Sequence, residues 1–559
     1  PGTAARILDY LAVWVSLDGS SRSVEHQVIR LQSEEAIRRF AEQEVRGDLV
    51  LHMRVIKRDG RILEPEAVDG KPTVTFPHLE IGDYIETEQV FSREGTSGNS
   101  YEGPHWFFRE KDVAYARSEM VMITPTEKTL DVAVTGAVPA PQLTDHGYFQ
   151  VRRWRVDQSP AAPDEPHSVP AVEYLPSVRV TWGVDLKTHL RELTERVTES
   201  TPIDPRIVRI AKRIVADIPA DQETARARSL YRWILSNVQA DEESDGRRVI
   251  VGKRGNHWRG FVTLCRSLGI PVTWALAKNR LAAPAAGPAD EVRQFTTTAL
   301  RVGRKDPVWL TIADKYTPFG YLPSEIRGMP AFLLEGNLPA QLSLPDTGAE
   351  DQVRFDAQVE LAADGSAEFT LSQAYHGRLG ATLRNGLGEL GASQARDVIE
   401  SKILATALPG ARLKTHELIA LDDNDVPLVV RMDSRMAHFA LGQGDLLRLA
   451  PPFVPRLSQF ATLPTRQTPI LLGGDRRWDV NLQIRLPKGA QVTLPKPSQL
   501  RFLDHRVEVG DTFEDGVLTL KRVVHIRAGR IAPENYAEFV RFTRDADSAL
   551  GAEIQIRLR

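Results

Sequence analysis

The chain has 559 residues, which is too long for one hydrophobic core and predicts three or four domains. A hydrophobic content of 42%, a charged content of 26% and a net charge of −3 with interleaved signs are ordinary for globular proteins and give no basic footprint for nucleic acid. No apolar run is long enough to span a membrane, and the single cysteine excludes an intrachain disulfide and leaves the redox compartment open.

Residues 1–180 predict a region made mostly of strands. Hairpin signals lie at Asp18-Gly19 and Asp59-Gly60, each between apolar-rich runs. A short helix is expected over 33–42, with Ser33 as its N-cap. The aromatic cluster at 105–108 is interpreted as alternating strand core, with a binding surface as the alternative.

A proline-rich stretch, Asp157 to Pro176, reads as an extended connector that ends this region. Helices are predicted over Leu186 to Glu199, from Pro205 with Asp204 as the cap, and over Ala220 to Gln239. The third helix carries its apolar face at Ala225, Leu230, Ile234 and Val238.

The most informative stretch is RGNHWRGFVTLCRSLGIP, Arg254 to Pro271. Asn256 is a candidate N-cap, and His257 stands at the start of the predicted helix. Gly269 ends the helix, and an extended apolar run follows over 272–277. The helix presents one apolar face, made of Phe261, Leu264, Cys265 and Leu268.

This stretch resembles the nucleophile helix of the transglutaminase-like superfamily, which groups transglutaminases with related cysteine peptidases. Bacterial members typically read Gly-Asp-Cys at the helix start and end on Leu-Gly-Ile-Pro, which this chain keeps at 268–271. The helix N-terminus stabilises a thiolate, so the resemblance implies a nucleophile at that start. Here Asn256 stands in the Asp position and His257 in the Cys position.

The resemblance also implies a His and an Asp on two strands downstream. Phe295 and the pair Trp309-Leu310 set the register, which puts Thr297 in the His position and Thr311 in the Asp position. The segment DKYTPFGYLPSEIRG, 314–328, closely resembles the continuation in the family. The scaffold is therefore expected to be intact, with all three positions of the triad replaced.

Two residues offer alternative chemistry. Cys265 lies on the apolar face eight residues after His257, where a buried thiol has a raised pKa and is usually inert, although a relocated nucleophile is the alternative. His257 is a candidate base or ligand contact, but no second His has metal-ligand spacing to it, so no metal site and no cofactor are expected. The loop 240–254 is charged where the family carries aromatic and proline residues, so the family's substrate is less readily inferred for this chain. The loop is interpreted as solvated, with a protein contact as the alternative.

From about Pro345 the pattern returns to strands, with a hairpin at Asp364-Gly365 and one inserted helix over Gln394 to Leu408. The sequence therefore predicts a multidomain α+β protein without a short-period repeat. Its expected parts are a β-rich domain over 1–180 that resembles the domain of unknown function common before transglutaminase-like domains, a transglutaminase-like (papain-like) α+β domain over 181–345, and a mostly-β, sandwich-like domain over 346–559.

The leading functional hypothesis is a non-catalytic, transglutaminase-like protein that binds or assembles other components, with a protein partner expected and nucleic acid excluded. One alternative is an enzyme of the cysteine type that reuses Cys265 or His257. Another is a peptide- or glycan-binding module that uses His257, Trp258 and Thr297 in the vacant groove. The resemblance implies the bacterial periplasm or the outer membrane. Because the first residue is Pro1, any signal peptide, membrane anchor or further domain would lie outside the given sequence.

Overall fold

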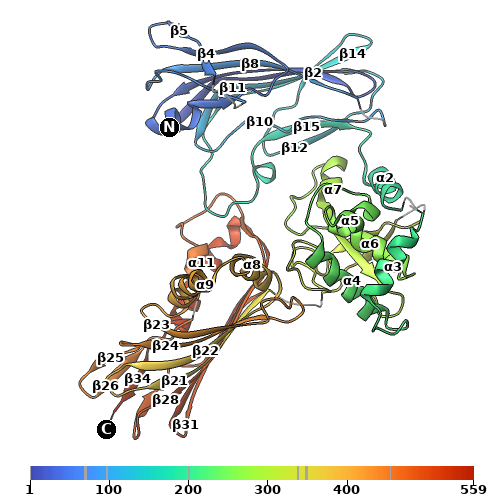
Figure 1. Ribbon diagram of the computed structural model, residues 1–559. Coiled ribbons are helices and arrows are strands. Elements are labelled where there is room, and N and C mark those ends of the chain that lie inside the picture. The colour runs from blue at the N-terminus through green and yellow to red at the C-terminus, as the bar shows by residue number, and fades with distance from the viewer. Residues whose placement is uncertain are drawn as a thin grey trace. The chain divides into compact units, whose positions relative to one another are not determined.

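The computed structural model describes residues 2–67, 72–95, 98–198, 202–336, 339–346, 351–453 and 455–558, and it is multidomain and rich in strands (Figure 1). The chain divides into two compact units. Unit 1 contains 1–190, 282–294 and 467–469, and unit 2 contains 191–281, 295–466 and 470–559. Since unit 2 takes in both regions expected after 181, the predicted boundary at 345 stays a prediction. No helix in the described ranges has the length and apolar character to cross a bilayer.

Unit 1 contains a sandwich of two sheets, which we call the N-terminal sandwich. Its larger sheet has the order β13 (Gln142–Asp145), β14 (Phe149–Ser159), β11 (Val113–Pro125), β1 (Ala4–Val15), β2 (Ser21–Leu31), β8 (Tyr84–Arg93), β4 (Leu49–Ile56) and β5 (Ile62–Leu63). Its smaller sheet has the order β10 (Trp106–Phe107), β15 (Ser177–Trp182) and β12 (Asp131–Thr135), with β9 (Tyr101–Glu102) also on β15. Figure 1 shows the smaller sheet facing the larger one.

The core of this sandwich explains the aromatic cluster at 105–108. Trp106 and Phe108 are buried with Trp154 and Trp182 between the two sheets, so the interpretation as strand core is confirmed. The predicted hairpins at Asp18-Gly19 and Asp59-Gly60 join β1 to β2 and β4 to β5. A small third sheet contains β3 (Glu42–Glu44), β7 (Thr73–Thr75) and β6 (Glu66–Ala67).

Helix α1 (Glu34–Phe40) confirms the predicted short helix and its cap, because the Ser33 side chain accepts a hydrogen bond from the Ala36 N–H. The segment 282–290, which is rich in small residues, is partly helical. It leads into α7 (Pro288–Gln294), whose Asp290 carboxylate accepts a hydrogen bond at 2.7 Å from the buried guanidinium of Arg179. The proline-rich connector continues β14 and then contains the short 3₁₀ turn Ala171–Glu173.

The first part of unit 2, which we call the central module, packs helices against a sheet of order β18 (Val308–Leu310), β17 (Phe295–Val302), β16 (Val272–Lys278), β19 (Pro330–Leu333) and β20 (Ala340–Ser343). Its helices are α3 (Pro205–Ile214), α4 (Glu223–Asn237), α5 (Gly246–Gly252) and α6 (His257–Ser267), preceded by α2 (Leu186–Thr198). α3 confirms Asp204 as a cap, and α4 buries Ala227 instead of the predicted Ala225. α5 was not predicted. It begins inside the charged loop, after the N-cap Asp245.

The second part of unit 2, the C-terminal sandwich, also has two facing sheets. The larger has the order β23 (Arg412–Ile419), β24 (Leu428–Met436), β22 (Ala367–Tyr375), β21 (Gln352–Leu361), β28 (Arg476–Arg485), β32 (Val517–Ile526), β31 (His505–Glu514) and β30 (Ser498–Phe502). The smaller has the order β25 (Ala440–Gln443), β26 (Leu446–Leu449), β34 (Ile554–Arg557) and β29 (Gln491–Thr493). A short separate pair joins β27 (Ile470–Leu472) to β33 (Gly529–Ile531).

The prediction of one inserted helix in this sandwich is wrong. Besides the predicted segment, the structure has α8 (Gly377–Leu387) and α11 (Tyr536–Leu550), and α11 packs on its sheet through Phe539 and Phe542. The predicted helix itself is divided into α9 (Ala392–Val398), a π-helical turn Ile399–Leu404 and α10 (Ala405–Ala407).

The two sandwiches share one strand plan. In each, the first strand pairs antiparallel with the second strand and parallel with a strand much later in the sequence: β1 with β2 and β11, β21 with β22 and β28. The remaining strands correspond in order. The N-terminal sandwich has β2-β8-β4, β11-β14-β13 and β10-β15-β12, and the C-terminal sandwich has β22-β24-β23, β28-β32-β31 and β26-β34-β29. The chain therefore contains the same β topology twice, on either side of the central module in sequence.

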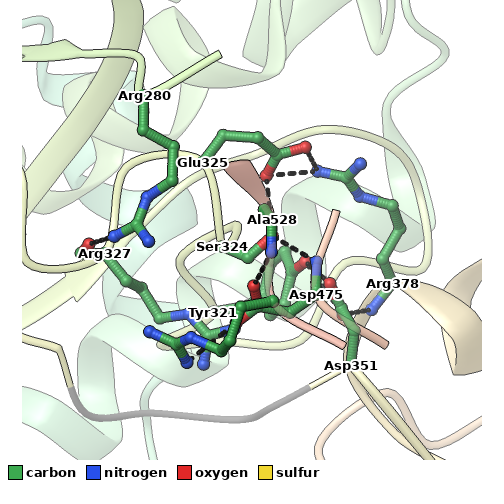
Figure 2. A network of polar contacts seen from close by, with 10 residues as sticks. Arg280, Tyr321, Ser324, Glu325, Arg327, Asp351, Arg378, Asp475 and Ala528 are labelled. Atoms are coloured by element: carbon green, nitrogen blue, oxygen red, sulfur yellow. Dashed lines mark hydrogen bonds and ion pairs between the residues drawn. The ribbon is translucent and has the colours of Figure 1, made fainter. Parts of the chain in front are cut away.

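Within unit 2, buried polar groups join the loop 314–328 of the central module to the C-terminal sandwich (Figure 2). The Tyr321 hydroxyl donates to the Asp351 carboxylate at 3.0 Å, and the Arg378 N–H donates to the same carboxylate at 2.7 Å. The Arg378 guanidinium pairs with Glu325 at 2.9 Å. These bonds connect the loop to the start of β21 and to α8.

A second group in the same network surrounds Asp475, just before β28. Its carboxylate accepts from the Ala528 N–H at 2.7 Å and from the Arg527 guanidinium at 3.0 Å (Figure 2). Arg327 lies 3.8 Å from the same carboxylate, and its own carbonyl accepts from Arg280 at 2.6 Å. The Asp475 N–H also donates to the Ser324 hydroxyl of the loop at 3.3 Å, so this part of the loop is connected to the start of β28 and, through Asp475, to the segment that follows β32.

Candidate functional site

The site is organised around the start of α6. The Asn256 side chain accepts a hydrogen bond from the Arg259 N–H at 3.1 Å, which confirms the predicted N-cap. Gly255 has a φ of +136°, and a Cβ at this position would lie 2.6 Å from Val249 of α5. The turn into α6 therefore requires glycine for its conformation and for the close approach of α5.

Three of the four residues of the predicted apolar face are buried in α6, whereas Leu268 is the C-cap and is only partly buried. Phe261, Leu264 and Cys265 are all 0% exposed, and the Phe261 ring packs edge-on against Tyr231 of α4 with centroids 5.6 Å apart. Burial raises the pKa of the Cys265 thiol well above its ordinary value. The thiol therefore belongs to the hydrophobic core of the central module.

Beside the start of α6 lies a groove of about 530 Å³ that contains two of the three positions matching the triad. Thr297 and Thr311 both line it, because β17 pairs with β16 on one side and with β18 on the other. The complete described lining is Val197, Asn256, Trp258, Arg259, Trp274, Thr296, Thr297, Thr298, Thr311, Ile312, Ala313 and Pro323.

His257 does not belong to this lining. Its Nε2 lies 2.8 Å from the carbonyl oxygen of Val238, the residue that ends α4, so the imidazole is fixed by a backbone hydrogen bond. The three residues predicted to bind a ligand are thus divided: Trp258 and Thr297 line the groove and His257 lies outside it.

The threonines are held by neutral partners. The Thr311 hydroxyl lies 3.3 Å from the Tyr321 carbonyl, to which the Thr311 N–H also donates at 2.9 Å. The Thr297 hydroxyl lies 3.5 Å from the Asn279 amide. Among the described residues, no imidazole or carboxylate is hydrogen-bonded to either hydroxyl to remove its proton.

Two tryptophans form the aromatic wall of the groove. The rings of Trp258 and Trp274 stack with centroids 5.9 Å apart, and the Arg259 guanidinium lies 5.4 Å from the Trp274 centroid. Trp274 is 7% exposed, and its indole N–H has no hydrogen-bond partner among the described residues. The wall of the groove therefore contains a buried donor that lacks a hydrogen-bond partner among the described residues.

Comparison with solved structures identifies a similar fold. The crystal structure of a "putative protease" from Parabacteroides distasonis is similar to this chain with a TM-score of 0.64, over 100% of this chain and 99% of that one. The two sequences are 12% identical, so the similarity shows the fold alone. No protein-family model and no curated protein matches the sequence.

The chemistry that the groove offers is hydrogen bonding and aromatic contact. Its described lining contains no cysteine, histidine or carboxylate. Over the described parts of the chain, no group of three or more His, Cys, Asp or Glu side chains is arranged to hold a metal ion. Sequence reasoning missed Trp274 and Arg259, because Trp274 reads as one more apolar residue of a strand and only the fold brings it to Trp258.

Proposed function

We propose that this chain is a non-catalytic, transglutaminase-like protein whose groove binds an extended peptide segment of a partner protein. The observation that carries the proposal is the composition of the groove. At the positions where the resemblance implies a base and an orienting acid, the described lining has threonine hydroxyls, and two tryptophans lie beside them, whereas His257, at the nucleophile position, lies outside the groove.

Among the described residues, those at and near the groove lack the groups that covalent catalysis needs. A hydroxyl or thiol attacks a carbonyl only when a base removes its proton or when its own pKa is lowered. Thr297 and Thr311 contact neutral amide or carbonyl groups, and burial raises the pKa of the Cys265 thiol. His257 is engaged with a backbone carbonyl outside the groove.

The donors and the size of the groove suit a peptide. Trp274 and the threonines present hydrogen-bonding groups suited to peptide carbonyls, and tryptophan and arginine supply much of the energy at protein interfaces. A volume of about 530 Å³ lies within the range of ligand sites. Transglutaminases and cysteine peptidases also act on protein chains, so a groove of this ancestry suits a peptide. From the same resemblance we propose that the protein works in the bacterial cell envelope as a binding or assembly component.

The test compares partner capture by the full chain and by two tryptophan variants. Wild-type protein, Trp258→Ala and Trp14→Ala are used as baits in cross-linked envelope fractions of the native cell. Trp14 is the matched control, because it is 47% exposed and lies on β1 of unit 1. We expect one specific partner with the wild type and with Trp14→Ala, and its loss with Trp258→Ala.

The captured partner is then divided into peptides, and binding of each peptide to purified protein is measured by fluorescence anisotropy. We expect one peptide to bind saturably to the wild type and at least about tenfold more weakly to Trp258→Ala, since hot-spot aromatic residues contribute more than 1–2 kcal/mol. Recovery of no specific partner, or a partner retained by Trp258→Ala, would overturn the proposal.

A further inference from the structure

A second cavity, independent of the groove, lies in the C-terminal sandwich. It has a volume of about 610 Å³ and is lined by residues of β21, β22, β28, α8, the π-turn and α10, and by Pro409, Pro451, Pro452, Phe453 and Pro455. Four aromatic side chains contribute to its wall, Phe355, Tyr375, Phe453 and Trp478, and Phe355 stacks on Phe453 with centroids 5.3 Å apart. Most of the remaining lining is aliphatic or proline, so the cavity suits an apolar molecule.

One polar side chain interrupts this apolar wall. Strand β22 turns alternate residues toward the interior, and the buried series Phe369, Leu371 continues with Gln373. Gln373 is 1% exposed. The Tyr375 hydroxyl donates to its Oε1 at 2.6 Å, but its Nε2 has no hydrogen-bond partner among the described residues. A buried amide donor without a partner is costly, and folding alone would favour leucine here.

The helical wall of the cavity is also irregular. The π-turn Ile399–Leu404 interrupts a segment that the sequence predicts as a continuous helix, and it supplies Lys402 and Ile403 to the lining. Single π-turns within α-helices are frequent at functional sites. Phe453 has a φ of +62°, which a bulky residue rarely adopts and which holds its ring in the wall.

Charge identifies the kind of ligand. Lys402 is exposed, and it is the one charged side chain in the described lining. An apolar cavity with one ammonium group and one unpartnered amide donor complements a molecule with an apolar body and an anionic oxygen group. A carboxylate is the group that accepts hydrogen bonds both from an ammonium and from an amide N–H.

We propose that this cavity binds a free straight-chain fatty acid, with its chain against the four aromatic rings and its carboxylate bound by the Gln373 amide and the Lys402 ammonium. The assignment does not depend on the groove of the central module. A failure of either proposal leaves the other intact.

The test is isothermal titration calorimetry of the full chain with dodecanoate below its micellar concentration. Dodecanol and dodecyltrimethylammonium are the neutral and cationic probes of equal chain length. We expect saturable binding of one dodecanoate per chain, with dodecanol binding at least about tenfold more weakly, since a hydrogen bond to a charged group accounts for about tenfold or more.

Two variants test the donors, and a third is the control. Lys402→Glu and Gln373→Leu should each weaken dodecanoate binding about tenfold or more, whereas Gln373→Leu should leave dodecanol binding nearly unchanged. Lys488→Glu is the matched control, because Lys488 is an exposed lysine of the same sandwich outside the lining. Circular dichroism verifies that each variant is folded, and Thr406→Trp, at an exposed lining position, should block the cavity if Gln373→Leu does not fold.

Three results would overturn the proposal. The first is absence of saturable dodecanoate binding. The second is equal binding of all three amphiphiles with no effect of Lys402→Glu, which indicates non-specific adsorption. The third is association with phosphatidylcholine vesicles without binding of dodecanoate, because the ligand would then be a membrane lipid and not a free acid.

Discussion

Alkylation of Cys265 separates the binding hypothesis from the cysteine-enzyme hypothesis. The chain has one cysteine, so a single mass increment on the intact protein reports on one site. The side chain is 0% exposed, so the reagent cannot reach the sulfur in the folded state. Burial also raises the pKa of the thiol, so the reactive thiolate does not form there. Reaction must therefore pass through an opening of α6.

The size of the effect follows from the side chains that such an opening exposes. Phe261, Leu264 and Cys265 share one buried face of α6, and full burial of an apolar side chain contributes about 1.5–3 kcal/mol. Exposing three of them costs about 5 kcal/mol at the least. Every 1.4 kcal/mol is a factor of ten, so native protein should react roughly a thousandfold or more slowly than unfolded protein.

The assay follows iodoacetamide modification by mass spectrometry in native buffer and in guanidinium chloride, with glutathione in the same tube as a free-thiol standard. We expect rapid reaction in denaturant only. Native reaction within about tenfold of the unfolded rate would refute the reasoning, since it requires a thiol that is already accessible and ionised. In that case the relocated-nucleophile hypothesis should be pursued with activity assays.

Three further predictions concern stability. Asn256→Ala should lower the free energy of unfolding by about 1 kcal/mol, seen as a lower Tm, whereas Asn237→Ala, which removes an exposed amide at the end of α4, should change it little. Arg384 is 1% exposed, and its guanidinium donates to three carbonyl oxygens of the loop 420–426. Arg384→Leu should therefore make proteinase K cleave that loop at least about tenfold faster, and unchanged protection would contradict this. Burial raises the pKa of Asp9 to about 6, so the native carboxyl holds a proton that the unfolded carboxyl releases near pH 4. The stability that this protonated carboxyl contributes is present below pH 4 and is lost as the pH rises through 6. Urea unfolding should show Asp9→Asn gaining about 3 kcal/mol relative to wild type between pH 4 and pH 7, and a difference independent of pH would contradict the raised pKa.

The sequence predicts best those features that depend on neighbouring residues. The Asn256 cap, the apolar face of α6 and the hairpin at Asp364-Gly365 are all found in the structure, because capping and turn chemistry act within a few residues. α11 was missed although Phe539, Phe542 and Ala546 have helical spacing. Because the end of the chain was expected to be a β region, this helical spacing was not interpreted as a helix.

Features that depend on distant residues were predicted only in part. Matching the strands by Phe295 and Trp309 placed Thr297 and Thr311 beside one groove, since strand register carries over from local sequence. The stacking of Trp258 on Trp274 depends on how α6 packs against β16, which no local pattern encodes. The buried polar position at Gln373 is only weakly indicated by the sequence, where a polar residue follows the alternating apolar residues Phe369 and Leu371.

The repeated strand plan has a consequence for synthesis. Strands that share a topology are candidates for pairing with the wrong copy, and misassembly between similar domains is a common failure of repetitive chains. About 170 residues separate Trp182, the end of β15, from Gln352, the start of β21, which corresponds to about 10–30 s of translation. The ribosome therefore delivers every strand of the first sandwich, each able to pair within its own copy, before the first strand of the second sandwich emerges.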